Sequence, residues 1–124
     1  MKVVKDKYRG QPVYHRVMRE LVLAAEYRGL TTYQDIAVIM GLPQQGSHMG
    51  RETGHLLGEI SEDEVLAGRP MLSAVAVGAS GKPGAGFFEF ARKLGRLEPG
   101  MDELEYWERE RQAVYEVWRR PLAK

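Results

Sequence analysis

The sequence of 124 residues contains no cysteine, and none of its apolar runs is long enough to cross a membrane. The absence of cysteine excludes disulfide bonds, catalysis by a thiol and metal sites with cysteine ligands. It also fits a cytoplasmic protein, and we expect that location. The first ten residues, MKVVKDKYRG, lack the long apolar core of a signal peptide. The length predicts one domain over residues 1–124, with a modest hydrophobic core.

Net charge is also small, at +1, but the charges are spread unevenly along the chain. Residues 1–30 contain seven Lys and Arg against three Asp and Glu, a net of +4. Residues 97–118 contain two Arg against seven Asp and Glu, a net of −5. Two interpretations follow. The basic N-terminal segment, residues 1–10, contacts an anionic partner, or the opposite charges pair within the folded chain.

The centre of the chain predicts two helices joined by a tight turn. Thr32 is a candidate N-cap, and Asp35 three residues later makes a short capping box. Gly41 supplies the left-handed position that commonly ends a helix, and Pro43 prevents its continuation. We therefore expect the second helix to begin near Ser47.

The second helix has glycine at every fourth position, namely Gly46, Gly50, Gly54 and Gly58. Each interior glycine destabilises a helix by about 1 kcal/mol relative to alanine, so the row needs a physical reason. Close approach by another backbone is the usual one. That backbone belongs either to a neighbouring helix of the same chain or to a nucleic acid or partner chain. We expect the acidic second half, residues 59–64, to face away from a bound nucleic acid.

The remaining segments predict two further helices, a strand and a glycine-rich loop. An apolar face at helical spacing predicts a helix over residues 12–27. A C-terminal helix should follow Gly100 and end near Arg119. Residues 71–77, MLSAVAV, are bounded by turn residues and predict a strand. The loop over residues 78–87 contains four glycines and one lysine.

Three phenylalanines, Phe87, Phe88 and Phe90, should then pack into the core from a second short strand or a helical turn. We therefore predict an α+β fold of winged-helix type with three or four helices. Its wing would be a short β-hairpin around the glycine-rich loop. A C-terminal helix and tail would occupy residues 100–124.

The segment TTYQDIAVIMGLP, followed by SHMG, resembles the DNA-binding half of the alkylguanine DNA alkyltransferases and the alkyltransferase-like proteins. The matching residues are Thr32, Tyr33, Asp35, Ala37, Gly41, Pro43 and Gly50. The resemblance implies a winged-helix domain whose second helix enters the minor groove of DNA. Ser47 stands where that family has its nucleotide-displacing arginine. The Pro-Cys-His-Arg motif is missing, so alkyl transfer to a protein thiol is chemically impossible.

A second resemblance covers RPMLSAVAV and GKPGAGFF. These segments resemble small uncharacterised bacterial proteins with a PGxGF loop. The resemblance supports expectations about the fold but implies no mechanism.

The candidate contacts with nucleic acid come from the helix pair and the glycine-rich loop. They are Tyr33, Gln34, Gln44, Gln45, Ser47, His48, Arg51 and Lys82. Polar side chains and the amides at the start of the second helix are expected to hold phosphates. Gln44 and Gln45 are expected to reach base edges.

These residues predict a non-catalytic module that binds nucleic acid, with DNA as the expected partner. One alternative is a protein–protein adaptor or homodimer that uses the glycine row or the C-terminal helix. A third possibility is a small nucleic-acid-modifying enzyme built on Glu52 and His55.

Four side chains on one face of the second helix, His48, Glu52, His55 and Glu59, are the best candidates for chemistry. At the rise of an α-helix, the two histidines lie roughly 10 Å apart along the axis, which is too far to share one ion easily. We therefore expect no metal, no other cofactor and no catalytic residue.

Overall fold

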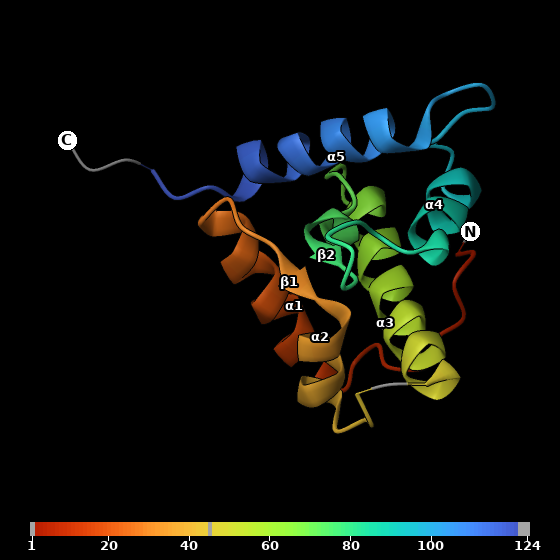
Figure 1. The fold of residues 1–124 in the computed structure, drawn as a ribbon. Helices are drawn as coiled ribbons and strands as arrows, with labels where there is room; N and C mark the ends of the chain where they lie inside the picture. The colour runs from red at the N-terminus through yellow and green to blue at the C-terminus, as the bar shows by residue number, and fades with distance from the viewer. Residues whose placement is uncertain (1, 45, 122–124) are drawn as a thin grey trace.

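The structure is a computed structural model that describes residues 2–44 and 46–121. Within these residues the chain forms a small α+β fold of five α-helices, one 3-10 helix and a two-stranded sheet (Figure 1). The elements in order are α1 (Pro12–Glu26), β1 (Thr31–Thr32), α2 (Tyr33–Met40), α3 (Ser47–Leu66), η1 (Leu72–Val75), β2 (Ala76–Val77), α4 (Ala85–Lys93) and α5 (Glu103–Trp118).

The two helices at the centre of the chain form as their sequence predicts. The Thr32 hydroxyl oxygen accepts a hydrogen bond from the Asp35 amide at 3.1 Å, which caps α2. Gly41 ends α2 with a φ of 75°, in the left-handed region. Helix α3 begins at Ser47, and helix α1 also matches its predicted range to within one residue. No helix in the part of the chain that the structure describes has both the length and the apolar character needed to cross a membrane.

The predicted strand over residues 71–77 is largely wrong. Only Ala76 and Val77 form a strand, and they pair in parallel with Thr31 and Thr32 of β1. The preceding residues are buried between helices, where side chains satisfy the backbone instead of a neighbouring strand. The Met71 amide donates to Glu110 at 2.9 Å, and the amide of Ser73 donates to the Ser61 hydroxyl at 3.2 Å.

The predicted β-hairpin wing is wrong for the same region. The amide of Gly78 donates to the Lys82 carbonyl at 2.9 Å, which closes a tight loop. Helix α4 begins at Ala85, directly after this loop, so no second strand follows to complete a hairpin. Phe87 and Phe88 are buried on α4, which confirms their place in the core.

Helix α5 lies across one end of α1 and α3 and closes the core (Figure 1). Its buried aromatic and apolar residues are Tyr106, Trp107, Val114 and Tyr115. The Trp107 indole donates to the Ala74 carbonyl at 2.8 Å. Arg111 lies over the Trp107 ring, with its guanidinium carbon 4.8 Å from the ring centre. The tail predicted after this helix includes residues 122–124, which are outside the described part of the chain.

The glycine row of α3 has two different environments. A Cβ atom at Gly58 would lie 2.5 Å from the ring of Phe90 on α4, so packing within the chain explains that glycine. At Gly50 and Gly54 a Cβ atom would meet no heavy atom within 4 Å apart from the nearby backbone of α3 itself. Internal packing therefore leaves these two glycines unexplained.

We expect Gly54→Ala and Gly58→Ala to change stability in opposite directions. Gly54→Ala should raise the free energy of unfolding by about 0.5–1 kcal/mol, because alanine is the better helix former and has open space there. In Gly58→Ala the Phe90 ring must move, and overpacking of this kind destabilises by about 1–3 kcal/mol. Urea denaturation of both variants measures the difference. Equal stability changes would contradict the assignment.

Candidate functional site

Two neighbouring hollows lie over the N-terminal half of α3. The first, here called the apolar pocket, has a volume of about 190 Å³, and Tyr33, Met49, Leu57 and Phe87 are among the residues that line it. The second, here called the α3 groove, is wider, with a volume of about 660 Å³. Its lining includes Lys7, Ser47, Arg51, Glu52, His55 and Glu89. Gly50, Gly54, Gly86 and Phe90 line both hollows, so the open glycines of α3 lie where the two meet.

Tyr33 belongs to the apolar pocket. Its hydroxyl oxygen accepts a hydrogen bond from the Gly84 amide at 2.8 Å, which ties the start of α2 to the start of α4. Burial raises the pKa of the Tyr33 hydroxyl, and this effect outweighs the hydrogen bond from Gly84, which lowers it. The hydroxyl is therefore neutral and positions the loop before α4.

The other candidate contact residues that the structure describes are exposed. Gln34, Gln44, Ser47, His48, Arg51 and Lys82 all present exposed side chains, whereas Gln45 lies outside the described residues. Ser47 and Arg51 line the α3 groove together. Lys82 lies in the loop that ends at Gly84, which borders the apolar pocket.

Arg51 and Lys82 differ from most cations near α3 because neither forms an ion pair with another residue in 2–44 or 46–121. Their charges are therefore available to an anionic ligand.

Two helices begin beside these hollows with glycine at the N-cap. Gly46 precedes α3 and Gly84 precedes α4, and neither helix start is capped by a side chain. The first amides of a helix have no partner inside the helix and carry the positive end of its dipole. Ser47 lines the α3 groove, and Gly86 of the first turn of α4 lines both hollows. The arrangement favours an anion at this surface.

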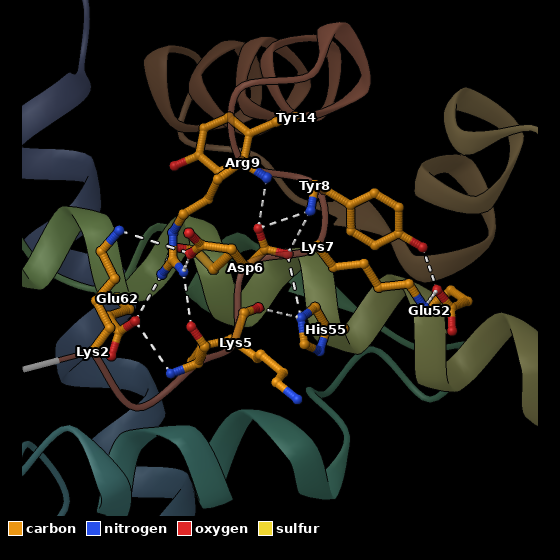
Figure 2. A network of polar contacts seen from close by, with 12 residues as sticks. Lys2, Lys5, Asp6, Lys7, Tyr8, Arg9, Tyr14, Glu52, His55 and Glu62 are labelled. Atoms are coloured by element: carbon orange, nitrogen blue, oxygen red, sulfur yellow. Dashed lines mark hydrogen bonds and ion pairs between the residues drawn. The ribbon is translucent and has the colours of Figure 1, made fainter.

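Residues 3–9, here called the N-terminal strap, cross α3 next to the groove, with Lys5 to Arg9 beside the helix (Figure 2). Glu62 accepts hydrogen bonds from the Val3 amide and, at 3.2 Å, from the Val4 amide. Glu59 accepts from the amides of Tyr8 at 3.0 Å and Arg9 at 2.8 Å. Both carboxylates are fully buried.

The acidic second half of α3 packs against other parts of the same chain. Glu59, Glu62 and Glu64 are buried. The strap covers the first two, and Arg69 pairs with the third at 2.6 Å.

Arg9 pairs with two carboxylates of α3 and with one of the strap itself. Its guanidinium lies 2.7 Å from Glu62, 3.1 Å from Asp63 and 2.5 Å from Asp6. Burial alone lowers the pKa of Arg9, but hydrogen bonds to these carboxylates raise it above its ordinary value, so the side chain stays charged. The Tyr14 hydroxyl also donates to Asp63, at 2.6 Å. Of the two interpretations of the basic N-terminal segment, pairing within the folded chain therefore holds for Arg9.

Three strap residues, Lys5, Lys7 and Tyr8, contact the two residues of the enzymatic alternative, Glu52 and His55. His55 Nε2 lies 2.7 Å from the Lys5 carbonyl oxygen and 3.3 Å from Glu59. Glu52 pairs with Lys7 at 2.5 Å and accepts a hydrogen bond from the Tyr8 hydroxyl. Hydrogen bonds from Lys7 and Tyr8 lower the pKa of Glu52 to about 2. Glu52 and His55 therefore both take part in holding the strap.

The contact that the sequence did not reveal is Lys7 in the α3 groove. Its positive charge was visible as part of the basic segment. The sequence contains no sign of its position in the groove, because its partner Glu52 lies far along the chain and no local pattern links Lys7 to Glu52.

No protein-family model, curated protein or solved structure matches the chain.

Replacement of Arg9 should destabilise the protein strongly. Arg9→Ala removes the charged partner of the buried Glu62, and losing one member of such a pair should lower the free energy of unfolding by about 2–4 kcal/mol. Lys2→Ala is the matched control, because the pair of Lys2 with Asp6 is exposed and should change stability by at most about 0.5 kcal/mol. Similar losses in the two variants would contradict a strap held mainly by Arg9.

The contact of Glu52 with Lys7 and Tyr8 of the strap should weaken in acid. The pKa of Glu52 in the folded protein is lowered from 4.5 to about 2, so its contribution to stability is present above 4.5 and is lost as the pH falls toward 2. The Lys7 and Tyr8 amide signals in NMR spectra should shift across this range. Glu52→Gln should remove these pH-dependent shifts. Unchanged shifts in this variant would show that a group other than Glu52 causes them.

Proposed function

We propose that this protein is a non-catalytic nucleic-acid-binding module, with DNA as its expected partner and the α3 groove as its contact surface. One observation carries the proposal. Two helix starts without side-chain caps lie at neighbouring hollows beside Arg51, which forms no ion pair with any residue the structure describes. Uncapped amides at a helix start and an arginine are the groups that bind backbone phosphates in nucleic-acid complexes.

The open glycines support the same surface. Apart from the nearby backbone of α3 itself, no heavy atom lies within 4 Å of a Cβ built at Gly50 or Gly54, although each glycine weakens the helix by about 1 kcal/mol. A sugar-phosphate backbone that rests on this part of α3 would come close to the helix axis without meeting a side chain. In this proposal α2 and α3 form a helix-turn-helix element, and α3 is the helix that meets the nucleic acid.

The charges in the groove predict the character of the binding. Lys7 and Arg51 line the groove together with Glu52 and Glu89, so cations and carboxylates are equal in number among these four. Affinity would then depend on a few phosphate contacts, and it should fall as salt rises. Exposed Gln34 on α2, Gln44 in the following loop and His48 on α3 supply polar groups for contacts to bases or sugars.

A second candidate function, a protein–protein adaptor, is favoured by the apolar pocket. Met49, Leu57, Phe87 and Phe90 give it a mostly apolar lining, and its volume of about 190 Å³ is large enough for a single side chain of a partner. A second copy of this chain would be one such partner. A mass in solution of twice the 14.0 kDa of the chain, together with no binding to nucleic acid, would favour this candidate.

Arg51→Ala and Lys82→Ala should each weaken nucleic-acid binding. Loss of one phosphate contact lowers the slope of affinity against salt by about 1 and weakens binding to all sequences similarly. Stability should change by no more than about 0.5 kcal/mol, because both side chains are exposed. Fluorescence anisotropy across a salt series, with duplex DNA, single-stranded DNA and RNA as probes, measures these effects.

Arg109→Ala is the matched control. Arg109 is an exposed arginine on α5, which lies far from the start of α3 (Figure 1). Its replacement should leave binding unchanged. If the wild-type protein shows no salt-sensitive binding to any of the three probes, the nucleic-acid proposal is replaced by the adaptor.

A further inference from the structure

Lys7 is the second cation of the α3 groove, but its charge is engaged. It lines the groove with Ser47 and Arg51, and its ammonium nitrogen lies 2.5 Å from a Glu52 carboxylate oxygen. We propose that a phosphate of the bound nucleic acid takes Lys7 from Glu52, so that the N-terminal strap forms part of the binding surface. This inference rests on the proposed function and adds a contact residue and its regulation.

The strap is anchored on both sides of Lys7. The amide of Val4 is bound to Glu62, and the amides of Tyr8 and Arg9 are bound to Glu59. The backbone at Lys7 is therefore fixed beside α3, while the Lys7 side chain is 50% exposed. A lysine side chain has a long stem with several rotatable bonds, so its ammonium group can change partner without movement of the strap.

Glu52 keeps a hydrogen-bond donor when Lys7 leaves. The Tyr8 hydroxyl donates to the same carboxylate, and burial together with the nearby Glu52 raises the Tyr8 pKa to about 12, so this donor stays protonated. Removal of the only partner of a shielded carboxylate is strongly unfavourable, and Tyr8 prevents that situation. The exchange of Lys7 from Glu52 to a phosphate therefore has a low energetic cost.

The exchange also explains how a groove with balanced charge can attract an anion. While Glu52 holds Lys7, Arg51 is the cation of the groove lining that has no acidic partner among the described residues. Once released, Lys7 adds a second cation on the strap side of α3. Glu89 of α4 and His55 also line the groove, and the negative charge of Glu89 disfavours an anion there. An anionic backbone that reaches Lys7 and Arg51 together would fit this arrangement.

The test is a double-mutant cycle that uses anisotropy of labelled DNA and RNA oligonucleotides across a salt series. Lys7→Met should weaken binding about two- to five-fold, the usual range for an exposed ion pair, and lower the salt slope by about 1. Glu52→Gln should strengthen binding by a similar factor, because Lys7 is then free. In the Lys7→Met background, Glu52→Gln should gain much less, since no competition for Lys7 remains.

Glu89→Gln is the matched control. It removes a carboxylate from the same groove, but Glu89 does not pair with Lys7, so its effect should be the same with and without Lys7. Hydrogen exchange at the amides of Val4, Tyr8 and Arg9 reports whether the strap stays docked in each variant, and protection should be retained.

Four results would overturn the inference. Equal effects of Glu52→Gln in both backgrounds would mean that Glu52 acts only through general repulsion. Loss of strap protection in Lys7→Met would make Lys7 a structural residue. Binding that depends on Arg51 and is indifferent to Lys7 would remove the inference and leave the proposed function intact, whereas a wild-type protein without salt-sensitive binding would remove both.

Discussion

Two carboxylates buried on α3 determine how the N-terminal part of the chain is arranged. Glu59 and Glu62 are fully buried, and a buried carboxylate is tolerated only when hydrogen bonds and opposite charge compensate for the water that it loses. The strap supplies both, through its backbone amides and the guanidinium of Arg9. Helix α1 begins at Pro12, three residues after Arg9, so this clamp also sets where α1 meets α3.

Polar side chains take the same role in the middle of the molecule, where regular pairing is scarce. The sheet has only two residues in each strand, so the buried segment before β2 needs other partners for its backbone. Glu110 binds the Met71 amide and pairs with Arg96 at 2.5 Å, and the Trp107 indole binds the Ala74 carbonyl. These contacts connect α5 to η1 in the way that a longer strand pair connects two elements of a sheet.

The predictions that succeeded depend on local chemistry. A threonine cap, a left-handed glycine and a following proline act within a few residues, so Thr32, Gly41 and Pro43 were sufficient to place α2 and the start of α3. The prediction of a strand from Met71 to Val77 failed because an apolar run does not distinguish a strand from a buried 3-10 turn. Side chains distant in the sequence, such as Glu110, determined which of the two forms.

For the candidate site, the sequence identified Ser47 and Arg51 as neighbours on one helix, and they line one groove. It did not identify Lys7, whose neighbour Glu52 lies on a different element, or the burial of Glu59 beneath the strap. Helical spacing placed four glycines on one stripe but gave no sign that Phe90 fills the space at Gly58 and leaves Gly50 and Gly54 open. Contacts between distant parts of the chain are beyond what periodicity encodes.

The separation between the strap and its carboxylates also has a consequence during synthesis. Val3 and the Glu62 that binds it are 59 residues apart, so at about 5–20 residues per second the strap waits roughly 3–12 s before its partner is translated. During that interval the strap has no docking surface. Once α3 emerges, its carboxylates remain hydrated until the strap arrives, which keeps this face of the unfinished helix polar. The first residues of this fold therefore cannot reach their place until α3 has been made.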